Sequence, residues 1–242
     1  MKIDRVTITG ADDSTKPEAL INLSEEFPYA EWGILFSKSH QGEPRYPSEA
    51  WVKKFTDVMD KSIDAGKPRL KLSAHLCGRW VRDIVLDGKF TFYNESPENC
   101  WPYFQRIQLN FHGHKHPPCS GFIPALQPHT LREFIFQLDG VNDVVWKSAR
   151  DKGISAVPLF DRSGGAGVVP KSWPRAYPGA YNGYAGGLGP DSLAEELPKI
   201  AIAAGTERIW IDMETRVRSN EDRTFDIAKV RACLEIAKPF VS

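Results

Sequence analysis

The glycine-rich turn Ala185-Gly186-Gly187-Leu188-Gly189-Pro190-Asp191 has the residue types of an anion-binding loop. It separates residues 181–185, which have a strand-like pattern, from residues 192–204, which have a helix-like pattern. Small residues at such a turn let backbone N–H groups approach an anion, and the positive end of the following helix lies behind them. We therefore expect Gly186 and Gly187 to bind a phosphate or a similar anion, although the same turn also suits a plain connecting loop.

Two aspartates stand at the ends of apolar, strand-like runs. Asp161 follows residues 154–160, and Asp212 ends residues 208–212. A carboxyl group at the end of a buried strand is partly desolvated, which raises its pKa and suits it to general acid catalysis. We expect Asp161 to be this acid, with Asp212 in the same situation beside the substrate. The alternative for Asp161 is a structural carboxylate that caps the next loop.

Histidine and cysteine side chains form a second candidate site. His75 and Cys77 alternate along one strand-like run, and His112 and His114 alternate just after the next one. Alternate residues of a strand point to the same side, so each pair could hold one metal ion, with zinc as the candidate. This pattern predicts a metal-dependent lyase or hydrolase as an alternative function. Solvent-exposed histidines and a buried cysteine are the competing interpretation.

These candidate residues require a fold that brings strand ends together, and the periodicity of the chain predicts one. Strands are expected at residues 3–9, 32–36, 70–76, 106–111, 133–138, 154–160, 181–185 and 208–212. Helices are expected at residues 17–27, 48–65, 79–86, 141–152, 192–204 and 225–238, an irregular stretch at 88–103, a loop at 112–128, and only a short helix within 161–183. This alternation predicts a (β/α)₈ barrel in one domain, residues 1–242, with reactive groups after the strands. A doubly wound open sheet is the alternative.

The composition argues against several classes of function. Lysine and arginine together number 31, as do aspartate and glutamate, so no net charge attracts nucleic acid or an anionic membrane. No apolar run approaches the roughly 18 residues that span a bilayer, and residues 1–13 lack the apolar core of a signal peptide. We expect a cytoplasmic protein with reduced cysteines and a small anionic substrate, and a homodimer is left open. No nucleotide-binding motif is present, so no cofactor is expected unless the zinc alternative holds.

Several segments, in order along most of the chain, together resemble a known family. They are Val6-Thr7-Ile8-Thr9-Gly10, Phe36-Ser37-Lys38-Ser39 with Pro44-Arg45-Tyr46-Pro47-Ser48, Arg106-Ile107-Gln108-Leu109, Pro158-Leu159-Phe160-Asp161 with Gly164-Gly165-Ala166-Gly167, Ala185-Gly186-Gly187-Leu188, and Ile211-Asp212. The family that they resemble is phosphoribosylanthranilate isomerase. The resemblance implies a barrel that performs an Amadori rearrangement of an aminoaldose phosphate.

The resemblance also implies roles for individual residues. Asp161 takes the position of the family's general acid, and Arg45 that of an arginine that contacts the substrate carboxylate. Gly165 lies in the glycine-rich loop and is counted with the phosphate-binding residues. The position of the family's catalytic cysteine is Thr9, whose hydroxyl is a much poorer base at neutral pH. Asp12 follows closely in the sequence, and its carboxylate is the substitute base that we consider.

The loop after the eighth strand departs from the family. The family presents Ser-Ser-Gly to the phosphate there, and this chain has Glu214-Thr215-Arg216. The glycine that permits close backbone approach is missing, and the carboxylate would repel an anion. Arg216 is the side chain that we expect to replace these contacts. The sequence thus predicts a divergent barrel that acts as an isomerase or lyase, with a metal-dependent enzyme and a non-catalytic binding barrel as alternatives.

Overall fold

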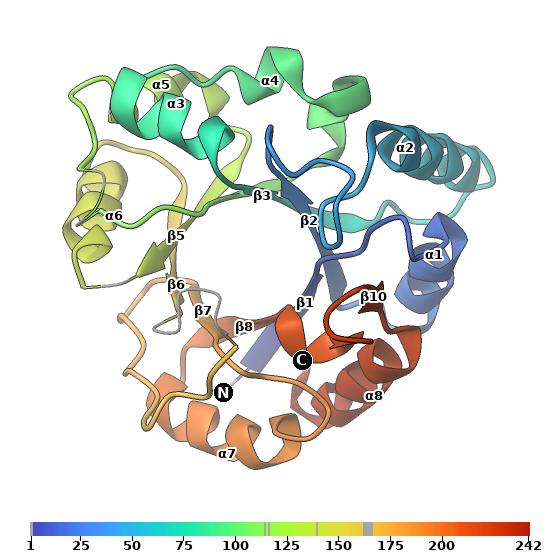
Figure 1. Cartoon of the computed structure of the whole chain (residues 1–242). Helices are drawn as coiled ribbons and strands as arrows, with labels where there is room; N and C mark the ends of the chain where they lie inside the picture. The colour runs from blue at the N-terminus through green and yellow to red at the C-terminus, as the bar shows by residue number, and fades with distance from the viewer. Residues whose placement is uncertain (1, 114, 116, 139, 162–166) are drawn as a thin grey trace.

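Eight parallel strands close into a barrel in the computed structural model, which describes residues 2–113, 115, 117–138, 140–161 and 167–242 (Figure 1). The strands are β1 (Lys2–Thr9), β2 (Ala30–Phe36), β3 (Lys71–Leu76), β4 (Arg106–Leu109), β5 (Glu133–Leu138), β6 (Ala156–Phe160), β7 (Asn182–Ala185) and β8 (Arg208–Met213). Each strand pairs with the next, and β1 also pairs with β8, where Thr7 lies opposite Asp212. The predicted (β/α)₈ fold is therefore confirmed, and the open sheet is wrong.

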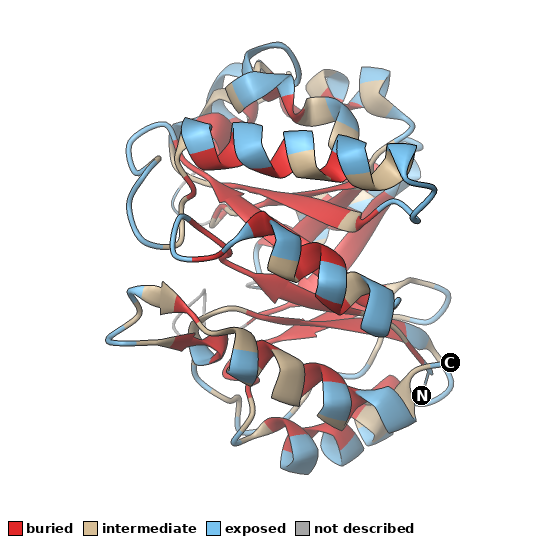
Figure 2. Ribbon diagram, turned by 90° about the vertical axis from the view of Figure 1, so that its right-hand side faces the viewer, coloured by how far each residue is buried: buried red, intermediate tan, exposed pale blue. Residues whose placement is uncertain are grey.

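Helices cover the outside of the barrel. They are α1 (Pro17–Glu26), α2 (Glu49–Asp64), α3 (Arg79–Asp87), α4 (Phe92–Glu95), α5 (Phe122–Leu126), α6 (Asn142–Asp151), α7 (Leu193–Ala204) and α8 (Ile227–Ala237), with 3₁₀ turns η1 (Pro97–Asn99), η2 (Trp101–Tyr103), η3 (Gln127–His129), η4 (Thr215–Val217) and η5 (Lys238–Phe240). A small hairpin of β9 (Arg218–Ser219) and β10 (Thr224–Phe225) follows β8. Figure 2 shows the helices with their buried residues against the strands and their exposed residues outward. The main apolar core therefore lies between the barrel and the helices.

Helix α2 shows how the local sequence produces these elements. Ser48 caps the helix, because its side-chain oxygen accepts a hydrogen bond from Trp51 N at 3.1 Å. Trp51, Phe55 and Met59 recur at helical spacing and are buried against the barrel. The helix ends at Asp64, and Gly66 follows with a positive φ of 78°, a backbone conformation that suits glycine. The predicted helix is confirmed within one residue at each end.

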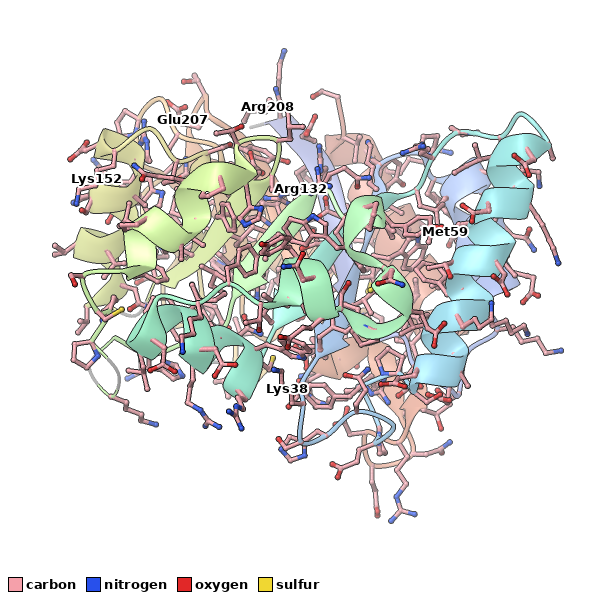
Figure 3. All side chains as sticks on the ribbon, turned by 90° about the horizontal axis from the view of Figure 1, so that it is seen from above. Lys38, Met59, Arg132, Lys152, Glu207 and Arg208 are labelled. Carbon is pink, nitrogen blue, oxygen red and sulfur yellow. The ribbon has the colours of Figure 1, made fainter. Side chains whose placement is uncertain are left out.

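The two ends of the barrel differ. Figure 3 shows Arg132 and Arg208, which stand at the beginnings of β5 and β8, toward one end of the molecule and Lys38, which follows β2, toward the other. The side chains that we consider functional follow the strands, so they belong to the end marked by Lys38. Buried charged side chains fill the interior at the opposite end, where the strands begin.

A charge network fills the inside of the barrel near the strand beginnings. Arg106 donates hydrogen bonds to Glu31 at 2.8 Å and to Glu133 at 2.7 Å, and its guanidinium lies 4.1 Å from the ring centre of Trp210. Arg5 donates to Glu31 at 2.6 Å. Complete burial acts to raise the pKa of Glu31, but Arg106 and Arg5 hold it below its usual value. These buried ions occupy the interior there and leave the other end for a cavity.

The structure differs from the sequence-based expectation in the loops. Residues 112–128, expected as a loop, contain the short helix α5, which tolerates Pro124 because the proline lies in its first turn. Residues 88–103, expected as irregular, contain α4, η1 and η2. The short helix expected within 161–183 is absent from the described part of that stretch, residues 161 and 167–183, while residues 162–166 lie outside the described residues.

All four cysteines are free thiols, as expected, with Cys100 and Cys233 buried and Cys77 and Cys119 half-buried. Within the described residues, no helix combines the length and apolar character needed to cross a lipid bilayer.

Candidate functional site

A cavity of about 330 Å³ opens at the end of the barrel where the strands finish. Residues that the sequence analysis proposed contribute much of its wall: Arg45, Cys77, His112, Asp161, Gly186, Gly187, Asp212 and Arg216. Of the expected residues that the structure describes, Thr9, Asp12 and His75 lie off this wall. Gly165 and His114 fall outside the described residues. Parallel strands thus bring together residues from distant parts of the chain, as this fold does in general.

Asp212 is a buried carboxyl group near the end of β8. Its side chain accepts a hydrogen bond at Oδ1 from Thr9 Oγ1 at 2.9 Å, and the residue is only 7% exposed. Burial raises the pKa of Asp212 to about 8, and the nearby carboxylates of Glu214, Asp161 and Glu31 add to the increase. The hydrogen bond from Thr9 acts in the opposite direction. Asp212 is therefore protonated at neutral pH and can donate a proton.

Asp161 lies directly after β6 on the same cavity wall. It is 7% exposed, and its Oδ2 accepts a hydrogen bond from Gln137 Nε2 at 2.6 Å. Gln137 comes from β5, so the amide fixes the orientation of the carboxyl group across two neighbouring strands. Asp161 also raises the pKa of Asp212, which places the two carboxyl groups within electrostatic reach of each other.

Asp12 does not reach the cavity. Its oxygens accept hydrogen bonds from Arg218 Nη2 at 2.6 Å, from the Arg45 backbone N–H at 2.7 Å and from the Ser14 backbone N–H at 3.0 Å. Burial opposes ionisation, but these donors hold the pKa of Asp12 below its usual value. A fully engaged carboxylate of lowered pKa is a weak base, so the expected role of Asp12 does not agree with the structure.

Thr9 is also a donor rather than a base in this arrangement, because its hydroxyl gives its hydrogen to Asp212. The hydroxyl stands behind the carboxyl group, inside the barrel, and is completely buried. Its visible effect is to orient Asp212 and to favour the ionised form of that group.

Arg45 joins two loops at the mouth of the cavity. Its Nη1 pairs with Glu214 Oε1 at 2.5 Å, its Nε pairs with Asp222, and its Nη2 donates to Thr215 at 3.3 Å. The residue has a positive φ of 77°, which few non-glycine residues adopt. Burial raises the pKa of Glu214 in spite of the arginine. A substrate carboxylate could bind Arg45 only by sharing the guanidinium with Glu214 and Asp222.

The glycine turn after β7 is tightly packed by its neighbouring loops. Gly186 and Gly187 have positive φ values of 116° and 64°, and a Cβ atom on Gly187 would lie 2.4 Å from Val169 N. A Cβ atom on Gly189 would lie 2.3 Å from Arg216 Cβ. Arg216 is exposed and donates to Gly167 O at 3.3 Å. The glycines are thus required by backbone conformation and loop packing, in addition to any contact with an anion.

Three of the candidate metal ligands lie among the described residues, and His75 lies off the cavity wall that Cys77 and His112 line. His75 is buried inside the barrel, and burial lowers its pKa to about 3. Cys77 lies on the cavity wall, where Asn110 Nδ2 contacts its Sγ at 3.1 Å and burial raises its pKa to about 11. Among the described residues, no three His, Cys, Asp or Glu side chains are placed to hold a metal ion. His75 lies within β3 and Cys77 directly follows the strand, and of these two residues Cys77 lines the cavity.

Amide side chains on β4 and β5 form part of the site that sequence reasoning missed. Gln108 Nε2 donates to Asn110 Oδ1 at 2.8 Å, and both residues line the cavity with Gln137. Gln108 Oε1 is buried and has no partner among the described residues, so it can accept a hydrogen bond from a ligand. The available signal was the alternation of Arg106, Gln108 and Asn110, which places polar groups on one side of a strand.

The chain was compared with known proteins by sequence and by structure. No family model and no curated protein matches the sequence. Among solved structures, monomers generated from dimeric phosphoribosylanthranilate isomerase of Thermotoga maritima match with 14% identity and a TM-score of 0.44, over 99% of this chain and 100% of that one. A Rubisco-like protein from Rhodopseudomonas palustris matches with 8% identity and a TM-score of 0.48, over 98% and 64% of the two chains.

A third solved structure, a putative spore coat polysaccharide biosynthesis protein E from Chromobacterium violaceum, matches with 10% identity and a TM-score of 0.55. The match covers 99% of this chain and 75% of that protein. At 10% identity this likeness shows a shared fold alone. It agrees with the closed eight-stranded barrel seen here.

Proposed function

We propose that the chain is an isomerase or lyase that moves a proton on a small anionic metabolite, with Asp161 and Asp212 as its acid–base pair. The observation that carries the proposal is that two buried carboxyl groups share one cavity wall while burial raises the pKa of Asp212 to about 8. A carboxyl group of raised pKa that shares a pocket with a second carboxyl group is an arrangement typical of acid–base catalysis. The proposal assigns both proton transfers to side chains of the protein and invokes no metal or organic cofactor.

The raised pKa supports Asp212 as the proton donor at neutral pH. Asp161, held by Gln137, then accepts a proton from the substrate carbon, and the two exchange roles when the reaction reverses. The position of Asp161 after an apolar run predicts instead that Asp161 is the acid, with Thr9 or Asp12 as the base. The two assignments share Asp161 but give it opposite roles, and the direction of the first proton transfer at Asp161 distinguishes them.

Anion binding would use the other side of the cavity. The glycine turn at Gly186 and Gly187 offers backbone N–H groups, and Arg216 offers a solvent-exposed guanidinium. Arg45 would contact a substrate carboxylate in competition with Glu214. These features, with the segments that resemble phosphoribosylanthranilate isomerase, favour a phosphorylated sugar derivative as the substrate and a divergent relationship to that family.

The test measures carbon-bound deuterium, because proton transfer at carbon in D₂O leaves a label in the product. The purified protein is incubated in D₂O with a panel of aldose, ketose and aminoaldose phosphates, and products are followed by mass spectrometry and NMR. We expect incorporation with at least one compound and a loss of about 10²–10⁴-fold in Asp161→Asn and in Asp212→Asn.

The matched control is Asp57→Asn, which removes an exposed carboxylate on α2 that pairs with Lys53. This variant should keep the activity of the parent protein. Unchanged exchange in Asp161→Asn and Asp212→Asn would refute the acid–base roles. Binding of a compound without any exchange would instead support a non-catalytic binding barrel, an alternative favoured by the donor role of Thr9.

A further inference from the structure

Gly33 on β2 lies between Thr9 and His75, and the space that its missing side chain leaves is shared by both of these residues. It pairs with Thr9 of β1 on one side and with Ser73 of β3 on the other, two residues before His75. A Cβ atom at this position would lie 2.2 Å from Thr9 Oγ1 and 2.9 Å from His75 Nε2. The first distance is far shorter than any real contact, so another residue would force the threonine aside. The glycine thus lets a hydroxyl group and an imidazole nitrogen face the same space.

The Nε2 atom of His75 is buried and has no hydrogen-bond partner among the described residues. Buried polar atoms rarely stay unpaired, because the lost hydrogen bond to water is costly. Burial lowers the pKa of His75 to about 3, so the ring is neutral and carries one N–H group. Of the three heavy atoms nearest to the missing Gly33 Cβ, the other polar one is Thr9 Oγ1. It donates its own hydrogen to Asp212 Oδ1 at 2.9 Å and keeps lone pairs that can accept.

We propose that His75 is a positioning residue for Asp212: its Nε2–H donates to a water molecule that in turn donates to Thr9 Oγ1, and so keeps the Thr9 hydroxyl donating to Asp212. The hydroxyl is then fixed in direction, since it accepts from one neighbour and donates to the other. The inference rests on the proposed function for the role of Asp212, but the hydrogen-bond chain can be measured without any substrate.

The charges around His75 and Asp212 cannot produce the effect that we assign to this chain of hydrogen bonds. Glu31 and Arg106 are the charged groups that act on His75, and their effects are opposite in sign. Asp212 itself responds to Glu214, Asp161 and Glu31. Because the histidine is neutral, replacing it with another neutral residue changes no charge near Asp212. An effect of such a replacement on Asp212 must therefore pass through hydrogen bonding or packing.

The experiment measures the pKa of Asp212 by carboxyl ¹³C NMR, with the signal assigned from its loss in Asp212→Asn. Thr9→Val should raise this pKa by about one unit, because a donor to the ionised carboxyl group is lost. His75→Met should raise it by a smaller amount. His75→Gln, whose side-chain Nε2 can donate from a similar position, should restore the parent value.

The double variant Thr9→Val/His75→Met decides whether the histidine acts through the threonine. We expect the pKa of Asp212 in the double variant to equal that in Thr9→Val alone. A shift from His75→Met that persists without the threonine hydroxyl would overturn the proposal, as would no shift from His75→Met in the presence of Thr9. Thr9→Ser keeps the hydroxyl, so the pKa of Asp212 should equal that in the parent protein. This variant separates loss of the donor from changed packing. Failure of the deuterium-exchange assay would refute the proposed function and leave this titration result intact.

Discussion

Two aspartates near the barrel mouth have pKa values shifted in opposite directions. Asp12 is surrounded by donors, including the buried guanidinium of Arg218, and its pKa falls. Asp212 has Thr9 as its donor and three carboxylates nearby, and its pKa rises to about 8. The partners that decide the difference are brought close by the fold, since Arg218 is far from Asp12 in the sequence. At the residue scale, function therefore depends on what faces each carboxyl group.

The raised pKa of Asp212 predicts how the stability of the protein depends on pH. In the unfolded chain this group ionises near its usual value of about 4, whereas in the native state it keeps its proton up to about pH 8. Between these limits the native state binds more protons, so this group's contribution to stability is fully present below pH 4 and is lost as pH rises toward 8. The slope contributed is at most about 1.4 kcal/mol per pH unit.

Asp212→Asn should remove this contribution. The free energy of unfolding of the variant, relative to that of the parent protein, should therefore increase as pH rises from 5 to 8. Urea denaturation at pH 5, 6.5 and 8 measures the free energy of unfolding of each protein. Asp57→Asn serves as the exposed control and should follow the parent protein. Parallel curves for the parent protein and Asp212→Asn would show that the native carboxyl group ionises normally.

At the scale of elements, the loops after β6, β7 and β8 support one another. Gly187 packs against the backbone of Val169, and Gly189 packs against Arg216. A side chain on the glycine turn would separate these loops and widen the cavity wall that they form. The anion-binding surface that we propose is thus a product of three loops, and the sequence of the turn alone does not define it.

Gly187→Ala tests this packing against a matched glycine. Gly66→Ala is the control, because Gly66 also has a positive φ and a Cβ atom there would meet no atom within 4 Å. Strain at a positive φ costs roughly 1–3 kcal/mol in either variant, and Gly187→Ala should lose more because of the contact with Val169 N. Thermal and urea denaturation measure the difference. Equal losses in the two variants would mean that the loop packing contributes nothing.

At the scale of the whole molecule, the barrel has a polar interior over much of its length. The buried charges of Glu31 and Arg106 lie at one end, and Asp161 and Asp212 lie at the other. Removing one member of a buried ion pair leaves the other charge without compensation. The network therefore contributes to stability in a way that depends on all of its members.

Glu31→Gln should destabilise the protein by roughly 3–5 kcal/mol, because Arg106 and Arg5 would lose their shared partner. Glu195→Gln is the control: it removes an exposed partner of Lys199 and should cause little change. Chemical denaturation of the two variants at pH 7 provides the comparison. A small loss for Glu31→Gln would indicate that the arginines find other partners or that water reaches them.

The fold could be predicted from the sequence because alternating apolar runs and capped helices such as α2 are local patterns. Asp161 and Asp212 could be placed at the barrel mouth for the same reason, since each lies at or just beyond the end of an apolar run. The surroundings of Asp12, Arg45 and His75 could not, because Arg218, Glu214 and Gly33 come from other strands or loops. Pairing between distant side chains leaves no periodic signal in the sequence.

A parallel bridge between Ile3 and Val241 brings the first and last segments of this chain side by side, and Ser242 N donates to Ile3 O at 3.2 Å. The two ends of the backbone therefore lie close together, so the chain is almost circular. If a short linker joined these two segments and the ring were opened within an exposed loop, every strand would keep both of its neighbours. Such a circular permutation would change the order in which the eight βα units are translated, but it would keep their arrangement in the barrel.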